Sequence, residues 1–327
     1  MSSRISQSEF VAMMAMMVAT VAFSIDSMLP AMPDIAAIHI PEDEANIGFA
    51  MRECNWLQAM EVGIDPAHAS FLHRFLQDED PSEGYGKQFR DKAGNTEMPM
   101  TQLLREYPRP DIRVEETDFG LRLISLRHMK DGRSHVRVTN QIFPEAICIP
   151  MSSEMTITQW HVPVDDETCY WYSMFTSFGK PVNKTLMREQ RMKEHRLPDY
   201  APLKNKRNNS GYNPDEQASL TYTGMGLDIN VHDQWAVESM GPFQDRTDEH
   251  LGKTDVGIIR YRRMLRAAMD ALEKGEEEAL PMRGAVDPST LKGPLSNDAI
   301  ADSADWDAAS LRADAERRDA CPWDAGL

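Results

Sequence analysis

Five runs of alternating apolar and polar residues between positions 111 and 178 constrain the fold most. They read IRVEETDFGLRLISLRH, SHVRVTNQIF, EAICIPM, EMTITQWHVPVDD and TCYWYSMFTSF, and they are rich in Val, Ile, Thr and aromatic residues. A period of two places successive side chains on opposite faces of a strand, and the Lys-Asp-Gly and Asp-Asp-Glu sequences in this region are typical of turns. We therefore predict an antiparallel β-sheet over residues 111 to 178.

Two helices are expected beyond this sheet. LMREQRMKEHRLPDY, residues 186 to 200, lies in a linker rich in lysine and arginine and is predicted to be helical. A longer helix is predicted from Thr254 to Glu273, because apolar residues recur there at helical spacing. These residues are Ile258, Ile259, Met264, Leu265, Ala268 and Leu272. The basic residues of the linker are mixed with Glu and Asp, which favours a solvated surface over a nucleic-acid-binding patch.

The stretch NWLQAMEVGIDPAHASFLH ends in an Asp-x-x-His-x-x-x-x-His pattern formed by Asp65, His68 and His73. Gly63 suits the end of one helix, and Asp65 followed by Pro66 suits the start of another, with His68 one turn inside it. Five residues turn an ideal helix by roughly 500°, which leaves the two histidines about 140° apart. Binding one ion therefore needs a π-bulge or a bent last turn. The alternative is that the histidines are surface or capping residues.

This stretch closely resembles the iron-binding segment of the oxygenase (α) subunits of Rieske non-haem iron ring-hydroxylating oxygenases, particularly the phthalate dioxygenase-like branch. In that family Asn-Trp, a Glu, a Gly and the Asp-x-x-His-x-x-x-x-His pattern occur in the same order. The resemblance implies that His68 and His73 are two ligands of a 2-His-1-carboxylate facial triad on Fe(II). It also implies that Asp65 is not a ligand but links the iron site to the Rieske cluster of the neighbouring subunit.

The resemblance covers residues 39 to 274 and implies a mononuclear iron catalytic domain. The implied fold is α+β, a helix-grip arrangement in which an antiparallel sheet wraps a long C-terminal helix. Complete members of the family form trimer-based oligomers. In them a Rieske cluster and a reductase or ferredoxin supply electrons, and Fe(II) activates O₂ to hydroxylate an aromatic ring or to remove an O-methyl group. His161, on a predicted strand, is a candidate substrate-binding residue, with a structural histidine as the alternative.

The third ligand of such a triad has to be a carboxylate. The candidates in the acidic region after residue 221 are Asp228, Asp233, Glu238, Asp245, Asp248 and Glu249. VHDQWAVES matches the family's segment before its last long helix, where the ligand Asp is followed five residues later by a Glu. The match implies Asp233 as the ligand and Glu238 as the follower. Asp245 is expected to pair with Arg246 or to cap a helix, and His232 is expected to point away from Asp233 on an alternating segment.

The sequence departs from the family at the Rieske centre, which needs two Cys and two His. In the family these ligands occur in two sequence motifs, Cys-x-His and, some twenty residues later, Cys-x-x-His. Neither pattern surrounds the four cysteines of this sequence, which are Cys54, Cys148, Cys169 and Cys321. The [2Fe–2S] cluster ligands are therefore expected to be missing from these residues.

Residues 1 to 38 differ in character from the rest. FVAMMAMMVATVAF contains no charge, and the apolar stretch continues to Ile38 if Ser24, Asp26 and Pro30 are tolerated. Fourteen residues are short for a bilayer span, whereas the extended stretch is long enough. The segment resembles the first transmembrane helix of major facilitator drug-efflux transporters. A fusion remnant or artefact, a signal-like peptide and a membrane anchor over residues 10 to 38 are the alternatives.

Composition limits the remaining possibilities. The 327 residues have 41% hydrophobic content and a formal charge of −17, which suits one large domain with tails and argues against a nucleic-acid partner. Without Cys-x-x-Cys pairs, the cysteines indicate reduced thiols in a cytoplasm. Residues 275 to 327 are acidic and poor in large apolar residues, so we predict a mostly disordered tail.

The function expected from the resemblance is hydroxylation or O-demethylation of an aromatic acid by a mononuclear Fe(II) site. Partners would be the aromatic substrate and O₂, with electrons from a reductase or ferredoxin or through intact oxygenase subunits. Two alternatives remain open. In the first, the chain is an inactive fragment, or an aromatic-ligand-binding domain, that assembles with intact subunits. In the second, it is a membrane-tethered oxygenase-like protein.

Overall fold

The structure, a computed structural model, describes residues 45–78, 92–94, 96–197, 200–281 and 296–322. The hydrophobic segment of residues 1 to 38 lies outside these ranges, so its resemblance to a transporter helix stays a prediction. Within the described ranges no helix combines the length and the apolar character needed to cross a membrane.

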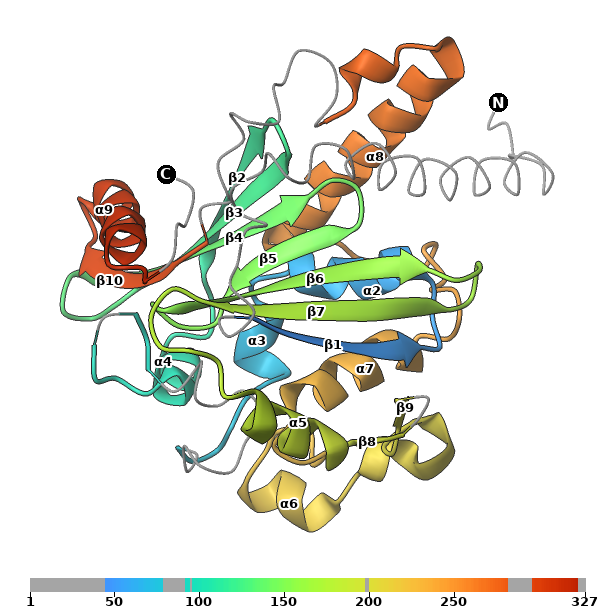
Figure 1. Cartoon of the computed structure of the whole chain (residues 1–327), viewed down its shortest axis with the longest axis horizontal. Helices are drawn as coiled ribbons and strands as arrows, with labels where there is room; N and C mark the ends of the chain where they lie inside the picture. The colour runs from blue at the N-terminus through green and yellow to red at the C-terminus, as the bar shows by residue number, and fades with distance from the viewer. Residues whose placement is uncertain (1–44, 79–91, 95, 198–199, 282–295, 323–327) are drawn as a thin grey trace.

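One antiparallel sheet of eight strands forms the centre of the molecule (Figure 1). Seven strands follow the order β1-β7-β6-β5-β4-β3-β2, and the last strand, β10, pairs with β4. The strands are β1 (Ala45–Arg52), β2 (Asp111–Thr117), β3 (Gly120–His128), β4 (Arg133–Ile142), β5 (Ala146–Pro150), β6 (Met155–Pro163), β7 (Cys169–Ser177) and β10 (Asp298–Asp302). The predicted sheet over residues 111 to 178 is confirmed, and β1 and β10 extend it.

Helices and a small second sheet surround this core. The α-helices are α2 (Trp56–Ile64), α3 (His68–Phe71), α4 (Met100–Glu106), α5 (Lys184–Met192), α6 (Pro214–Ser219), α7 (Ile229–Ser239), α8 (Val256–Lys274) and α9 (Trp306–Asp319). The short strands β8 (His195–Arg196) and β9 (Ala201–Pro202) pair with each other, and 3-10 turns lie at Lys206–Gly211, Lys253–Asp255 and Glu277–Ala279. The predicted long helix occurs as α8. The helix predicted over residues 186 to 200 occurs only in part, because α5 ends at Met192 and His195–Arg196 form strand β8. The expected α+β class is confirmed.

The helices α2 and α8 cover the same face of the sheet (Figure 1). Trp56, Met60 and Ile64 of α2 are buried in one apolar cluster with Leu123 of β3 and with α8. The glycine at position 257 permits the close packing of α8, since a Cβ atom there would lie 2.9 Å from Leu123 Cδ2. The long helix near the C-terminus thus packs on the sheet together with α2, as the helix-grip prediction requires.

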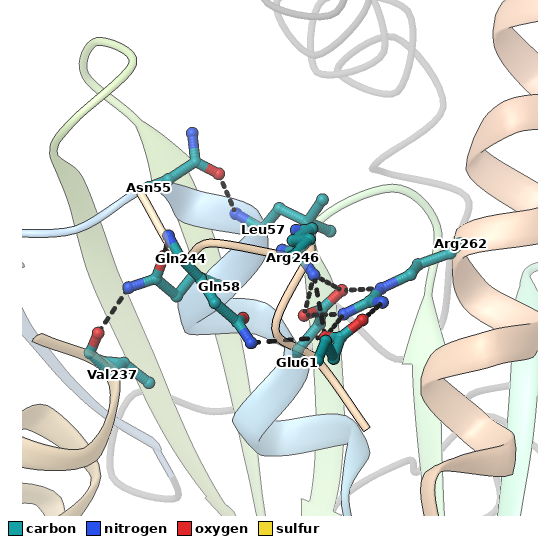
Figure 2. A network of polar contacts seen from close by, with 9 residues as sticks. Asn55, Leu57, Gln58, Glu61, Val237, Gln244, Arg246 and Arg262 are labelled. Carbon is teal, nitrogen blue, oxygen red and sulfur yellow. Dashed lines mark hydrogen bonds and ion pairs between the residues drawn. The ribbon is translucent and has the colours of Figure 1, made fainter. Parts of the chain in front are cut away.

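Polar contacts fix α2 to its neighbours (Figure 2). Glu61 is 6% exposed and receives a bidentate pair of hydrogen bonds from Arg262 of α8, Nε to Oε1 at 2.6 Å and Nη2 to Oε2 at 2.8 Å. Arg246 Nη1 donates to the same carboxylate at 3.0 Å. One turn earlier in α2, Gln58 Nε2 donates to the Val237 carbonyl of α7 at 2.6 Å. These bonds hold α2, α7 and α8 in one arrangement.

The C-terminal region differs from the prediction. The expected disordered tail is wrong for the part that the structure describes, because β10 pairs with residues 133–137 of β4. Strand β5 pairs only with residues 140–142 of β4, so β10 occupies the remainder of that edge. Helix α9 follows, and its Trp306 packs against the apolar side chains of β3 and β4 on the face opposite α2.

Buried polar bonds, which composition does not reveal, hold this segment in place. Asn297 Oδ1 accepts a hydrogen bond from Ser310 Oγ at 2.8 Å, and Arg317 Nη1 donates to the Ser296 carbonyl at 2.7 Å. All four of these side chains are less than a tenth exposed. A segment with few large apolar residues can therefore be ordered by hydrogen bonds that the rest of the fold shields from water.

We expect Glu61→Gln to lower the free energy of unfolding by about 2–4 kcal/mol, because it removes the buried charge that accepts from both Arg262 and Arg246 and leaves Arg262 with Glu249 alone. Urea denaturation followed by circular dichroism measures this change. The matched control is Glu115→Gln, since the Glu115–Arg122 pair at 3.2 Å has side chains 52% and 28% exposed and should contribute less than about 1 kcal/mol. Equal effects of the two variants would contradict the role assigned to Glu61.

Candidate metal centre

The corner between α2 and α3 places the first histidine. Helix α2 ends at Ile64 with Asp65 as its C-cap, and Asp65 Oδ1 accepts a hydrogen bond from the Ala67 amide at 2.7 Å. The predicted caps differ in detail, because Gly63 lies inside α2 and Ala67, not Asp65, is the N-cap of α3. The predicted stop and restart of the chain is nevertheless present.

The second histidine lies beyond the end of a very short helix. Helix α3 is a single turn that ends at Phe71, so His73 does not follow helical geometry. The problem of a five-residue helical step is thereby removed. The rings of His68 and His73 meet edge to face, with their centroids 5.0 Å apart.

The third group comes from α7, where the sequence-based expectation needs correction. The alternating segment expected around Asp233 is a helix, because Asp228 caps its N-terminus by accepting from the Asn230 amide at 2.9 Å. Adjacent residues on a helix are about 100° apart rather than opposite. As a result His232 does not point away from the site; it is fully buried and its ring stacks on His73 with centroids 5.6 Å apart.

The structure brings together His68, His73 and Asp233. One nitrogen or oxygen atom from each lies within 4.8 Å of the other two. Asp233 Oδ1 is 3.1 Å from His73 Nε2 and 3.7 Å from His68 Nε2. Two ligands at right angles on an ion about 2.1 Å away are separated by about 3 Å. The three groups therefore have the separations needed to occupy one face of the coordination sphere of a single metal ion.

Backbone carbonyls select the tautomers of the histidines. The carbonyl of Asp65 can only accept, so His68 Nδ1 carries the proton and Nε2 keeps its lone pair. His232 Nε2 donates to the Gly226 carbonyl at 2.9 Å, which leaves Nδ1 of neutral His232 as an acceptor for His73 Nδ1 at 3.4 Å. In both ligand candidates the free lone pair thus lies on the nitrogen that faces Asp233.

Electrostatics at the site favour a charged carboxylate at Asp233 and a neutral imidazole at His232. Burial acts to raise the pKa of Asp233, but His73, His68 and His232 outweigh it and hold this pKa below its ordinary value. Burial, together with the neighbouring His73, lowers the pKa of His232 to about 4. Asp233 Oδ1 is buried and accepts no well-aligned hydrogen bond from the described residues. A buried anionic oxygen without a donor is costly unless a cation supplies the missing interaction.

The other candidate carboxylates lie elsewhere. Asp245 is exposed and accepts hydrogen bonds from Thr247, so it neither pairs with Arg246 nor joins the centre. Glu238 is buried one turn after Asp233, where it accepts hydrogen bonds from Gln234 Nε2 and the Glu53 amide. Asn55 is the N-cap of α2.

His161 is placed away from the centre. It is completely buried against Trp171, with ring centroids 5.0 Å apart, and its Nδ1 lies 3.3 Å from the Glu145 carbonyl. Burial lowers the pKa of His161 to about 4. Its neighbour on the same strand face, Gln159, lines the cavity next to the metal centre, and His161 is not among the lining residues.

That cavity has a volume of about 140 Å³ and extends from the three metal-ligand candidates along the covered face of the sheet. Its apolar wall includes Ile149, Ile157 and Phe175, and Asp65 lines it close to His68. Arg127 of β3 and Arg137 of β4 contribute two guanidinium groups. Sequence reasoning missed both arginines. The available signal was their position among the inward-facing residues of alternating strands, where a charge is unusual.

The sequence model of the LigXa C-terminal domain-like family matches residues 26–320, a range that includes β10 and α9. Among solved structures, Pseudomonas putida CBB5 NdmA (QL mutant) with theobromine is similar with a TM-score of 0.40 and 15% identity, covering 72% of this chain and 54% of that one.

Curated relatives extend this match. The oxygenase subunit of phthalate 4,5-dioxygenase from Pseudomonas putida is 29% identical over 254 residues, which are 73% of this chain and 55% of the relative. The oxygenase subunit of 3-chlorobenzoate-3,4-dioxygenase from Comamonas testosteroni is 26% identical over 75% of this chain and 58% of the relative. The oxygenase subunit of 5,5'-dehydrodivanillate O-demethylase from Sphingobium sp. is 24% identical over 80% of this chain and 52% of the relative.

This chain thus spans a little over half the length of these relatives. Because the family model matches most of its residues, the chain belongs to the LigXa C-terminal domain-like family, as a phthalate dioxygenase-related catalytic domain of Rieske aromatic ring-hydroxylating oxygenase α subunits.

Proposed function

We propose that this chain is a mononuclear non-haem iron oxygenase domain that hydroxylates or O-demethylates an aromatic acid. The observation that carries the proposal is the meeting of His68, His73 and Asp233 beside a cavity lined by apolar side chains. Fe(II) bound by these three residues would supply oxygen activation, since a 2-His-1-carboxylate set leaves positions open for O₂ and substrate.

The residues around the proposed iron site prepare it for binding. The Asp65 carbonyl holds the proton of His68 on Nδ1, and His232 does the same for His73, so neither ligand has to change its tautomer. Asp233 supplies the only carboxylate of the set and is held on α7, which Gln58 binds to α2. These contacts support a preformed site.

The cavity supports an aromatic acid as substrate. An apolar cavity of about 150 Å³ is large enough for a benzene ring, and the volume here is about 140 Å³. Ile157 and Phe175 provide apolar surface for the ring, whereas Arg127 and Arg137 provide positive charge for a carboxylate. The substrates named for the curated relatives, phthalate and 3-chlorobenzoate, are of this chemical class.

Electrons would have to arrive through another protein surface. Asp65 lies at the cavity next to His68, in the position that the family uses to bridge to a neighbouring subunit's Rieske cluster. A groove beside His68 carries the exposed aromatic side chains of Phe71, Tyr222 and Trp235. Such a patch next to the proposed iron site supports the approach of another subunit in a homo-oligomer, of an intact oxygenase subunit, or of a ferredoxin.

A second candidate function is an aromatic-ligand-binding domain that works only in mixed assemblies. The specific observation in its favour is that none of the four cysteines has the Cys-x-His or Cys-x-x-His spacing of a [2Fe–2S] centre. Metal analysis together with an absorption spectrum separates iron alone from iron plus cluster.

We expect His68→Ala and His73→Ala to abolish Fe(II) binding and Asp233→Ala to weaken it by at least about 100-fold, because each removes one of three ligands. Asp245→Ala is the control and should bind as the unaltered chain does. Anaerobic Fe(II) titration of each variant, with circular dichroism to verify folding, makes the measurement. Retained iron in the Asp233 variant with loss in the Asp245 variant would reverse the assignment.

A separate variant tests the support of His73. His232→Phe keeps an aromatic ring but removes the acceptor for His73 Nδ1, so Fe(II) affinity should fall by about 10- to 100-fold. His250→Phe, at an exposed histidine outside the centre, should leave the affinity unchanged. If the two variants bind Fe(II) equally well, His232 does not orient the ligand.

Turnover should depend on an external source of electrons. We expect the 327-residue chain with NADH and a ferredoxin-type reductase to give no sustained product from phthalate-like or methoxylated aromatic acids. Hydrogen peroxide, which brings both oxygen and electrons, should allow at most a single turnover, and an added intact oxygenase subunit should restore cycling. Product analysis by chromatography decides the matter, and sustained NADH-dependent product from the chain alone would refute the prediction.

A further inference from the structure

Strand β10 places a buried carboxylate, that of Asp298, next to Arg137 of β4, which lines the cavity. Asp298 is 2% exposed and accepts three hydrogen bonds, from His135 Nε2 at 2.7 Å, from Arg137 Nη1 at 3.1 Å and from the Gly94 amide. Burial lowers the pKa of His135 despite its contact with Asp298, so this imidazole is neutral at pH 7. The charge of Asp298 is therefore balanced by one neighbour, Arg137.

Among the residues that the structure describes, no carboxylate pairs with the second guanidinium of the cavity. Arg127 is 1% exposed and donates to the neutral oxygens of Ser125 at 3.2 Å, Pro66 at 3.2 Å and Ser70 at 3.1 Å. Its Nε is buried and has no hydrogen-bond partner among the described residues. Burial and the nearby Arg137 lower the pKa of Arg127 to about 10, which leaves it charged at pH 7. A buried charge of this kind needs an anion.

The formal charges of the described residues that surround the cavity do not cancel. Two guanidinium groups and the Asp298 carboxylate leave one positive charge without a partner. A divalent ion with the single carboxylate of Asp233 would add one more, and Asp65 at the cavity cancels it. One positive charge thus remains for a ligand in the cavity to neutralise.

We propose that Asp298 is a specificity-determining residue, which makes the cavity bind an aromatic monocarboxylate more tightly than an aromatic dicarboxylate. The inference rests on the proposed function and names the substrate class of the same site. A single carboxylate would neutralise the charge that Arg127 leaves uncompensated. A second carboxylate would enter a cavity of about 140 Å³ whose other guanidinium is already paired with Asp298.

The test compares the affinities of three ligands of similar shape for the full Fe(II)-loaded chain under anaerobic conditions at pH 8. Benzoate carries one charge, phthalate carries two, and benzamide is neutral. Isothermal titration calorimetry at fixed ionic strength gives the three dissociation constants. We expect benzoate to bind at least about tenfold more tightly than benzamide, and more tightly than phthalate.

Variants then alter the charge at Asp298 and Arg137. Asp298→Asn leaves two uncompensated guanidinium groups, so the affinity ratio of phthalate to benzoate should rise by about tenfold or more. Arg137→Gln leaves Arg127 and Asp298 in balance, so benzoate should lose its advantage over benzamide. The double variant has the same charge as the unaltered chain and should recover that advantage. Asp302→Asn, at the exposed end of the same strand, is the control and should change no ratio.

A purely structural role for Asp298 gives a different result, namely equal loss of affinity for all three ligands and unchanged ratios. That outcome would overturn the inference, as would tighter binding of phthalate than benzoate by the unaltered chain. If Asp298→Asn does not fold, the benzoate-to-benzamide ratio of Arg137→Gln still decides, and an unchanged ratio refutes the role of charge. Failure of all three ligands to bind would instead refute the aromatic cavity, and with it both proposals.

Discussion

The bidentate pair between Glu61 and Arg262 is the interaction on which the geometry of the candidate centre depends. It joins α2 to α8, and α8 packs on the sheet beside Leu123. One turn earlier, Gln58 binds the carbonyl of Val237 at the end of the helix that carries Asp233. The histidines follow directly from the C-terminus of α2. A rotation of α2 would therefore move the two histidines relative to Asp233.

Neutralisation of buried charge is the second constraint on this fold. At α2, two carboxylates, Glu61 and Glu249, pair with two arginines, Arg246 and Arg262. On the covered face of β3 and β4, the described residues supply one carboxylate, Asp298, for two arginines. The first set is balanced and gives a fixed support. The second set is not balanced by the described residues, which is the condition expected at a binding site rather than in a structural core.

The sequence predicts those features that depend on local periodicity or on a contiguous motif. In the structure the five alternating runs form β2 to β7, and the segment in which Ile258 and Leu265 recur at helical spacing forms α8. His68 and His73 lie eighteen residues or fewer from Asn55 in one recognisable stretch. The residues that bind across the fold were not predicted in the same way. Arg137 and Asp298 are far apart in sequence, and their contact depends on where β10 joins the sheet.

The error at the C-terminus has the same origin. Residues 296 to 322 lack the apolar content that sequence analysis associates with order, and they are held by buried hydrogen bonds of Asn297, Ser310 and Arg317. The error at α7 arose because an eleven-residue segment with polar residues at most positions has weak periodicity of either kind. Its helical form is set by the Asp228 cap and by burial against α2, and neither is evident from alternation alone.

Arg127 connects these two constraints. Its Nη2 donates to the Pro66 carbonyl and to Ser70 Oγ, so it fixes the corner and the single helical turn that carry His68. Arg127 also lines the cavity, and among the described residues its Nε has no hydrogen-bond partner. Helix α3 is too short to be stable by itself, and its position must come from such tertiary contacts. A carboxylate that approaches Arg127 would therefore contact a group that also holds the segment carrying a ligand candidate.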